Sequence, residues 1–354
     1  MIDEALLRTV GTLFGASAAL AAVVWLAHSA WATLVAQREA RARPAALHAL
    51  AGALHGGETA PALAQLDRLG ALSSISALIE MARTVAGEQR DRLDAIAREW
   101  GVLDHAESWA ASRRWSRRLR AARLIALFGT GEERSGEALL DDADADVRAQ
   151  AAEWAGGHPS PARIKRLAKM LGDPERRCRF AAREALVDAG RGAIVELDTA
   201  LGRVHGIAAV GALEAARELA VPDFLPDAIG LMTAPDPAVR ARAASLAAAI
   251  GGPEAVESLV LMLGDGDPEA RAAAATGLGH LGRWEQAASV AGLLGDPEWR
   301  VRRAAALALR RMGPTGELLL RREGRAGEGP ATDTARSALE LPPAGASEQA
   351  EQPA

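Results

Sequence analysis

The sequence predicts an all-α protein whose helices stack in pairs as a solenoid. Of its 354 residues 49% are hydrophobic but only 3% are aromatic, so the core must come mainly from alanine, leucine and valine. Strands favour β-branched and aromatic residues, whereas alanine favours helix, which argues against a sandwich or a barrel. A spacing of about 31 residues also recurs along the chain, and such a period is typical of stacked helix pairs.

Charge and cysteine content exclude several classes of protein. The formal net charge is −5 at pH 7, which does not indicate a nucleic-acid binder. Cys178 is the only cysteine, so an internal disulfide framework and a multi-cysteine zinc or iron–sulfur cage are both excluded.

The first 37 residues predict a membrane segment. After a short tail at 1–9, the stretch 10–37 holds no Asp, Glu, Lys or Arg, and its apolar run from Leu13 to Val35 is long enough to span a bilayer. We therefore expect a transmembrane helix at 10–37. The alternative is a cleaved signal peptide, which would make the chain a secreted or periplasmic binding module.

Flanking charges predict the orientation of this segment. Arg38, Arg41 and Arg43 follow the apolar run, so the positive-inside rule places the N-terminus outside and the repeats in the cytoplasm, on the plasma (inner) membrane. Gly11 and Gly15 form a GxxxG spacing, which allows two such helices to pair, so a homodimer through the transmembrane helix is a further expectation.

Residues 38–112 predict helices without the repeat signature. Apolar spacing indicates helices at 72–85 and 88–100. We expect these helices to form a juxtamembrane cap that shields the first apolar repeat face.

Seven repeats are expected over 113–323. The recurring arginines are Arg117, Arg148, Arg179, Arg240, Arg271 and Arg302. Their separations are 31 residues except for the 61 between Arg179 and Arg240, so a degenerate copy that lacks the arginine should lie near Val210. Each unit is predicted to form two helices. The first helix is capped by Asp, has Pro at its first position and ends at Gly, as in Asp296, Pro297 and Gly313.

The repeat pattern resembles a known family. Asp236 and Pro237, followed by Val239, Arg240 and a pair of alanines, resemble the HEAT family, most closely its short bacterial subclass of phycobilisome-lyase-like HEAT repeats. The resemblance implies a protein-binding scaffold. Because a minority of the family are enzymes, a lyase-like or cofactor-handling enzyme is the alternative.

Two motifs imitate ligand sites without the required context. Gly277, Gly279 and Gly282 match GxGxxG, but they end a repeat helix instead of following a strand. The aspartates at 142–146 imitate a calcium loop, but Val147 stands where the loop needs glycine. We therefore expect no cofactor, no metal and no catalytic residues.

The recurring arginines predict a structural ladder. Stacking places them in a row beside the capping aspartates of neighbouring units, where bidentate Arg–carboxylate bonds can bridge repeats. The expected ladder consists of Arg148, Arg179, Arg240, Arg271 and Arg302.

Two basic clusters exceed what the repeats require. The first cluster consists of Arg113, Arg114, Arg117, Arg118, Arg120 and Arg123. These arginines flank Trp115 and Leu119, which are expected to face inward together with Ala122 and Ile125. The first cluster predicts binding to anionic lipids or to a partner, unless nearby acidic residues neutralise it. The second closes the solenoid, offers a partner surface and consists of Arg300, Arg303, Arg310 and Arg311. Nucleic acid is not expected, because no aromatic platform accompanies these arginines.

Residues 324–354 are rich in Gly, Pro, Ala, Ser and Glu and are expected to be largely disordered, apart from a short helix around 334–341. The whole sequence thus predicts a membrane-anchored cytoplasmic HEAT-like scaffold that binds and organises a protein partner at the membrane, with a membrane-resident enzyme as one candidate.

Overall fold

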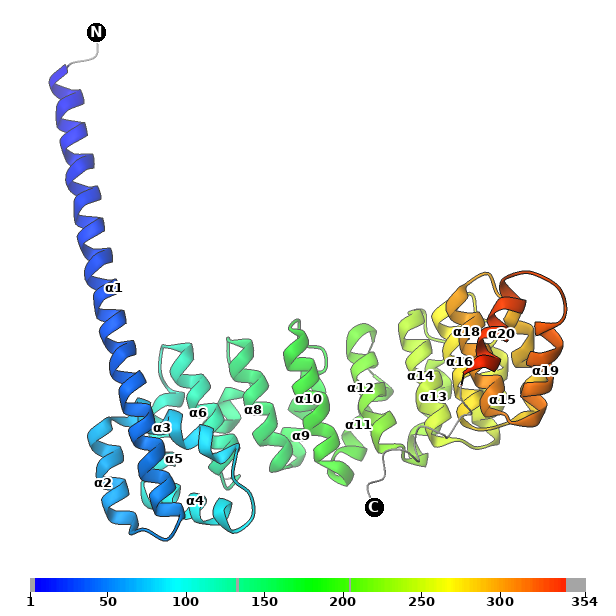
Figure 1. The fold of residues 1–354 in the computed structure, drawn as a ribbon, viewed down its shortest axis with the longest axis horizontal. Coiled ribbons are helices and arrows are strands. Elements are labelled where there is room, and N and C mark those ends of the chain that lie inside the picture. The colour runs from blue at the N-terminus through cyan, green and yellow to red at the C-terminus, as the bar shows by residue number, and fades with distance from the viewer. Residues whose placement is uncertain (1–3, 132–133, 204, 342–354) are drawn as a thin grey trace. The chain divides into compact units, whose positions relative to one another are not determined.

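The computed structural model describes residues 4–131, 134–203 and 205–341, and all regular structure in these ranges is helical (Figure 1). The predicted all-α repeat fold is therefore confirmed. The chain divides into two compact units, Met1–Gly129 and Thr130–Ala354, which we call unit 1 and unit 2.

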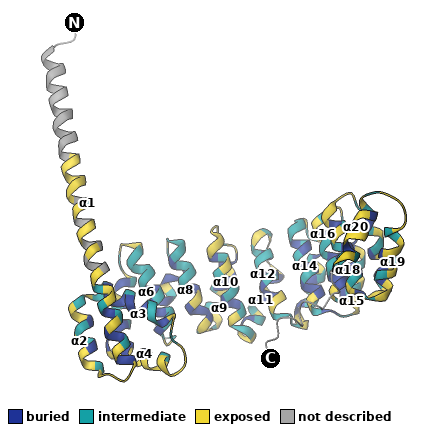
Figure 2. Cartoon of the chain, viewed as in Figure 1, coloured by how far each residue is buried: buried dark blue, intermediate teal, exposed yellow. Residues whose placement is uncertain are grey.

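Unit 1 is built on one long helix. Its helices are α1 (Glu4–Leu54), α2 (Thr59–Leu69), α3 (Ala71–Ala82), α4 (Glu88–Glu99), α5 (Val102–Ala110) and α6 (Trp115–Phe128). α1 continues through Pro44 and packs against α2 and α3, where Ala46 and Leu50 are buried. The end of α1 is therefore part of the core of unit 1, whereas its described apolar residues Val23–Leu26 are exposed (Figure 2).

The predicted membrane span is not supported. Within the described part of the chain, no helix combines the length and the apolar character that crossing a bilayer demands. The prediction of a single-pass plasma-membrane protein with its N-terminus outside and its repeats in the cytoplasm is therefore wrong. Eight of the 23 residues from Leu13 to Val35 are alanine, whose small side chain contributes little apolar area. Gly11 and Gly15 lie in α1, outside the residues whose side chains the structure describes.

Unit 2 is a row of helix pairs. Its helices are α7 (Arg134–Leu139), α8 (Ala145–Gly157), α9 (Pro161–Met170), α10 (Arg176–Asp188), α11 (Ile194–Leu201), α12 (Gly206–Leu219), α13 (Leu225–Leu231), α14 (Pro237–Ile250), α15 (Pro253–Met262), α16 (Pro268–His280), α17 (Ala287–Gly292), α18 (Trp299–Arg311), α19 (Pro314–Gly324) and α20 (Pro330–Glu340). Short 3-10 turns are η1 (Gly190–Ala193), η2 (Pro222–Phe224), η3 (Trp284–Gln286) and η4 (Leu293–Gly295). We call α8, α10, α12, α14, α16 and α18 the first helices, because each opens a pair and consecutive members of this series pack on one another (Figure 1).

Small residues form the interior of the first helices. Three residues after each recurring arginine of α8, α10, α14, α16 and α18 the chain has alanine, and all five of these side chains are buried: Ala151, Ala182, Ala243, Ala274 and Ala305. A methyl group at this position lets neighbouring helices approach closely and fill the interior without voids. The repeated spacing in the sequence thus reflects one repeated packing site.

α6 buries part of the face that the sequence predicts. Ala122 and Ile125 are buried as expected, but Trp115 is 51% exposed, so the expected inward position of Trp115 is wrong. Arg118 donates from Nη1 to the carbonyls six and five residues before it, at 3.0 and 3.2 Å, as the recurring arginines of unit 2 do. Arg118 therefore occupies the position that the sequence pattern assigned to its neighbour Arg117.

The end of unit 2 holds a helix within the segment 324–354. α20 packs against α18 and α19, and its residues Thr332, Ala335 and Ala338 are buried. The structure places this helix at Pro330–Glu340, four residues earlier at its start than the expected helix near 334.

Candidate functional site

Arginine–aspartate pairs join neighbouring first helices. Three arginines donate Nε and Nη2 to both oxygens of one aspartate, at 2.8–3.0 Å; the pairs are Arg148–Asp173, Arg240–Asp265 and Arg271–Asp296. The Nη1 of the same arginines donates to two carbonyls of its own turn. Each arginine thus connects the start of its own helix to the turn before the next first helix, which we call a rung.

The rung aspartates are not the helix caps that the sequence indicated. Asp265 accepts from the N–H of Asp267 at 2.8 Å, and it is Asp267 that caps α16. In the same way Asp296 accepts from the N–H of Glu298, the residue at the N-cap position of α18. The acceptor therefore lies two residues before the cap, and 25 residues after its arginine, a spacing that would have identified it.

The rungs shift the pKa of their carboxyl groups. The hydrogen bond from Arg240 holds the pKa of Asp265 below its usual range, against the effect of burial. Burial raises the pKa of Asp173, but the hydrogen bonds from Arg148 and from the backbone outweigh it, so this pKa is lowered as well. Both carboxylates are therefore ionised partners near neutral pH.

The row of rungs stops at α12. Val210 takes the place of the arginine there, as the sequence predicted near this position. Arg179, on the preceding first helix, donates to the carbonyls of Asp173 and Pro174 at 2.8 Å, but among the described residues no carboxylate pairs with it. The rungs thus connect α8 with α10 and α14 with α16 and α18, and leave α12 without one.

Glycines allow the close approach of the helices that carry rungs. A Cβ on Gly156 would lie 2.7 Å from the Cα of Ala185, and one on Gly279 would lie 2.6 Å from the Cα of Ala308. A Cβ on Gly277 would lie 2.8 Å from the Cβ of Ala248. Two of the three glycines of the GxGxxG match therefore serve helix packing. On α10 the position equivalent to Gly156 and Gly279 is Val187. α10 and α12 pack less extensively than the other neighbouring first helices do.

A groove opens between α10 and α12 where the packing is loose. It has a volume of about 400 Å³, and its lining combines apolar and basic side chains: Arg176, Arg179, Phe180, Arg183, Ile207, Val210, Gly211 and Glu214. Phe180 and Ile207 are more than half exposed, and the guanidinium of Arg183 lies over the Phe180 ring at 5.0 Å.

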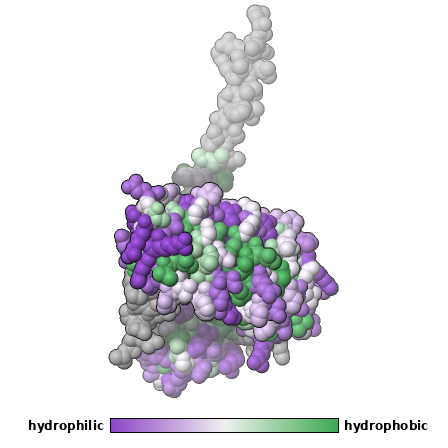
Figure 3. Space-filling model, turned by 90° about the vertical axis from the view of Figure 1, so that its right-hand side faces the viewer, coloured by the Kyte–Doolittle hydropathy of each residue, from purple (hydrophilic) through white to green (hydrophobic). Residues whose placement is uncertain are grey.

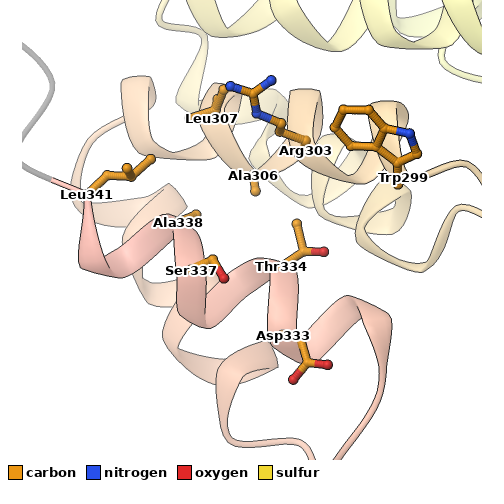
Figure 4. Close-up of a pocket in the computed structure, with 9 residues that line it drawn as sticks. All are labelled: Trp299, Arg303, Ala306, Leu307, Asp333, Thr334, Ser337, Ala338 and Leu341. Carbon is orange, nitrogen blue, oxygen red and sulfur yellow. The ribbon is translucent and has the colours of Figure 1, made fainter.

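A second groove lies between α18 and α20 at the end of unit 2. The groove has a volume of about 400 Å³. Figure 4 shows the residues that line it: Trp299, Arg303, Ala306, Leu307, Asp333, Thr334, Ser337, Ala338 and Leu341. Trp299 is 55% and Leu341 47% exposed, although both are large apolar side chains. Figure 3 shows apolar and polar side chains mixed over the face that it views. We call the groove between α18 and α20 the C-terminal groove.

The second basic cluster lies partly at the C-terminal groove. Arg303 lines it, and the guanidinium of Arg300 lies 5.8 Å from the Trp299 ring. Arg310 and Arg311 lie in the last turn of α18. Burial, together with the charges of Arg311 and Arg217, lowers the pKa of His280. The structure thus brings two members of this cluster to the groove and leaves two beyond it.

The first basic cluster is divided by the structure. Arg113 and Arg114 are exposed before and at the start of α6, and Arg117 and Arg118 are half-buried. Arg120 and Arg123 line a pocket with Arg43 and Arg83, which sequence reasoning had not grouped with them. No sequence spacing connects Arg43 or Arg83 with the two arginines of α6, because they come from other segments of the chain.

Cys178 packs in the interior of unit 2. It is buried, and its Sγ donates to the carbonyl of Ala145 at 3.2 Å. Burial raises the pKa of this thiol, which disfavours the reactive thiolate. Its position, equivalent to Val239 and Val301, agrees with a packing role.

Comparison with known proteins bears on the fold. Residues 257–322 match the family of HEAT repeats. No curated protein matches the chain. Among solved structures, the crystal structure of Kap121p is 14% identical with a TM-score of 0.53, and the match covers 84% of this chain and 39% of that one. The X-ray structure of YIBA_ECOLI is 16% identical with a TM-score of 0.42, over 69% of this chain and 97% of that one.

The likeness to Kap121p extends over about two fifths of that protein's length and concerns the fold. An engineered protein is similar at 18% identity and a TM-score of 0.40, over 84% of this chain and 94% of that chain. The helix pairs described above form a helical solenoid, and residues 257–322 of this solenoid match HEAT repeats.

Proposed function

We propose that this protein is a HEAT-repeat scaffold that binds a protein partner through unit 2. The observation that carries the proposal is the C-terminal groove, where Trp299 and Leu341 leave about half of their surface exposed beside a 400 Å³ hollow. Tryptophan and arginine are the side chains that most often dominate the energy of protein interfaces. An open groove of this composition suits the capture of a protein segment.

The groove favours an acidic, amphipathic segment of the partner. Arg300 and Arg303 flank the exposed indole, and Asp333 is the one carboxylate among the lining residues. The hollow is large enough to take an apolar side chain of the partner, while carboxylates beside it would pair with the two guanidinium groups. Kap121p, which shares the fold, has been crystallised bound to RanGTP and to Nup53p, so solenoids of this type do carry protein ligands.

The test is capture of a partner by matched variants. Wild-type protein, Trp299→Ser and Trp284→Ser would be crosslinked in cell extract, since Trp284 is 57% exposed and lies outside the groove. We expect a partner that the wild type and Trp284→Ser recover and that Trp299→Ser loses. With that partner purified, Trp299→Ser should raise the Kd at least about tenfold.

Charge reversal at Arg303 provides the second arm. Arg303→Glu should weaken the same complex and slow association at low salt, because rim charges act mainly on the association rate. A partner bound equally well by Trp299→Ser and Arg303→Glu would place binding elsewhere on the protein. Recovery of no partner under crosslinking would count against the scaffold function itself.

A further inference from the structure

Four arginines from three segments of unit 1 meet at one pocket. Arg43 comes from α1, Arg83 caps the end of α3, and Arg120 and Arg123 come from α6. The pocket has a volume of about 450 Å³, and the other residues that line it are Ser76, Ile79, Glu80 and Thr84. We call this site the arginine pocket.

The side chains that line the arginine pocket are predominantly basic. Glu80 is the one carboxylate among the lining residues, and it pairs with Arg43 at 2.7 Å. Four guanidinium groups and one carboxylate leave a net charge of +3 on the lining. Like charges gathered in one concave site raise the local potential, so an anion that enters is attracted by several of them at once.

Arg123 has a hydrogen-bonding group that the protein does not satisfy. The Nε of Arg123 is buried, and it has no hydrogen-bond partner among the described residues. A buried donor without an acceptor costs free energy, and a nearby anion reduces the electrostatic part of that cost.

The hydroxyl groups of the pocket are already engaged. Ser76 donates its Oγ–H to the carbonyl of Leu72 at 2.8 Å, and Thr84 donates its Oγ1–H to that of Met81 at 2.9 Å. Recognition of a ligand in this pocket thus depends on the guanidinium groups. The planar fork of a guanidinium group matches the oxygens of a tetrahedral oxyanion and can donate two hydrogen bonds to it. The fork of Arg43 is already engaged by Glu80.

We propose that the arginine pocket binds the phosphate group of a soluble phosphate monoester. Such a group carries close to two negative charges at neutral pH and has three strong acceptor oxygens, which suits several arginine forks better than a single carboxylate does. The pocket is larger than a phosphate group alone, which leaves space for the molecule that carries it. The inference does not rest on the C-terminal groove, which lies in unit 2.

Titration calorimetry on the full chain tests this proposal. The probes are inorganic phosphate, pyrophosphate and a phosphoserine peptide with its unphosphorylated counterpart. We expect saturable binding of phosphate-bearing probes that weakens as salt concentration rises. Tighter binding of the phosphoserine peptide than of both inorganic ions would identify a phosphorylated side chain as the carrier, and the reverse order would identify a small molecule.

Matched variants separate the pocket from general basic charge. Arg83→Gln and Arg120→Gln should each weaken the best probe at least about tenfold, since each loses a charged fork. Arg113→Gln and Arg114→Gln remove the same charge from exposed positions of the α6 region outside the pocket and should leave the affinity unchanged. Thermal unfolding would show that every variant is folded.

Two outcomes would overturn the proposal. One is the absence of saturable heat with every phosphate-bearing probe at low salt. The other is an equal loss of affinity in the pocket variants and the outside variants, because binding would then follow net charge alone. Neither outcome affects the protein-binding role of unit 2, whose tests use Trp299 and Arg303.

Discussion

The junction of α16 with α18 and the junction of α10 with α12 both join neighbouring first helices, but the first is tightly packed and the second is loosely packed. At the first, Gly279 lies against the backbone of Ala308, and Arg271 bridges to Asp296. At the second there is no glycine at the equivalent position and no rung on Arg179 among the described residues. The tightly packed junction thus combines a missing Cβ with a bridging carboxylate, and the junction that lacks both features has a groove.

Charged side chains replace small ones at the loose junction. Arg183 and Glu214, which are 3.4 Å apart, stand where α14 and α16 have the buried alanines Ala244 and Ala275. Glu214 also pairs with Arg242 at 3.0 Å. These groups are 23–38% exposed, so solvent and salt screen their attraction, and they hold the helices less firmly than packed methyl groups do.

The largest effect is expected from filling a close helix contact. Gly156→Ala should destabilise the protein by about 2–3 kcal/mol, because the new methyl group would lie 2.7 Å from the backbone of Ala185. Gly157→Ala is the matched control, since no atom lies within 4 Å of its Cβ position, and it should be neutral or slightly stabilising. Urea unfolding measures both. Equal effects of the two substitutions would refute the close-contact explanation.

Loss of a rung should have the next largest effect. Asp265→Ala leaves the guanidinium of Arg240 without its bidentate acceptor and is expected to cost about 2 kcal/mol of stability. Asp146→Ala removes the exposed partner of Arg177 and should cause no measurable change. If the two variants unfold at the same denaturant concentration, the rungs do not stabilise the stack.

Acid should remove the contribution of the rung. The pKa of Asp265 is lower in the folded protein than in the unfolded chain, so its stabilising effect is present above about pH 4 and is lost as pH falls through the folded-state pKa. The stability difference between the wild type and Asp265→Asn should therefore shrink from pH 6 to pH 2.5 in chemical denaturation. A difference that stays constant over this range would contradict the charge-assisted rung.

The smallest effect is expected at the loose junction. Glu214→Gln removes the charge shared by Arg183 and Arg242 and should cost less than about 1 kcal/mol at low salt. At 1 M salt the cost should disappear, because the Debye length falls to about 3 Å. Unfolding curves at both salt concentrations test this. A cost that persists at 1 M salt would show a buried hydrogen-bond role instead.

Local repetition made much of the fold predictable. The helical fold, the recurring arginine and the degenerate repeat near Val210 are all visible in the sequence, and each reappears in the structure. The rung acceptors differ from the predicted helix caps, because each acceptor lies two residues before the cap; at Asp265 and Asp267 both residues are aspartates. Only the spatial reach of the arginine side chain distinguishes them.

An all-helical chain, helices stacked in pairs and one degenerate repeat can be inferred from residue order, because periodicity and propensity are local properties. That Arg43 and Arg83 share a pocket with Arg120 and Arg123, and that Trp299 and Leu341 line one groove, is visible only in three dimensions. These segments are distant in sequence, and their proximity depends on helix packing angles and on which side chains are small enough to allow close contact.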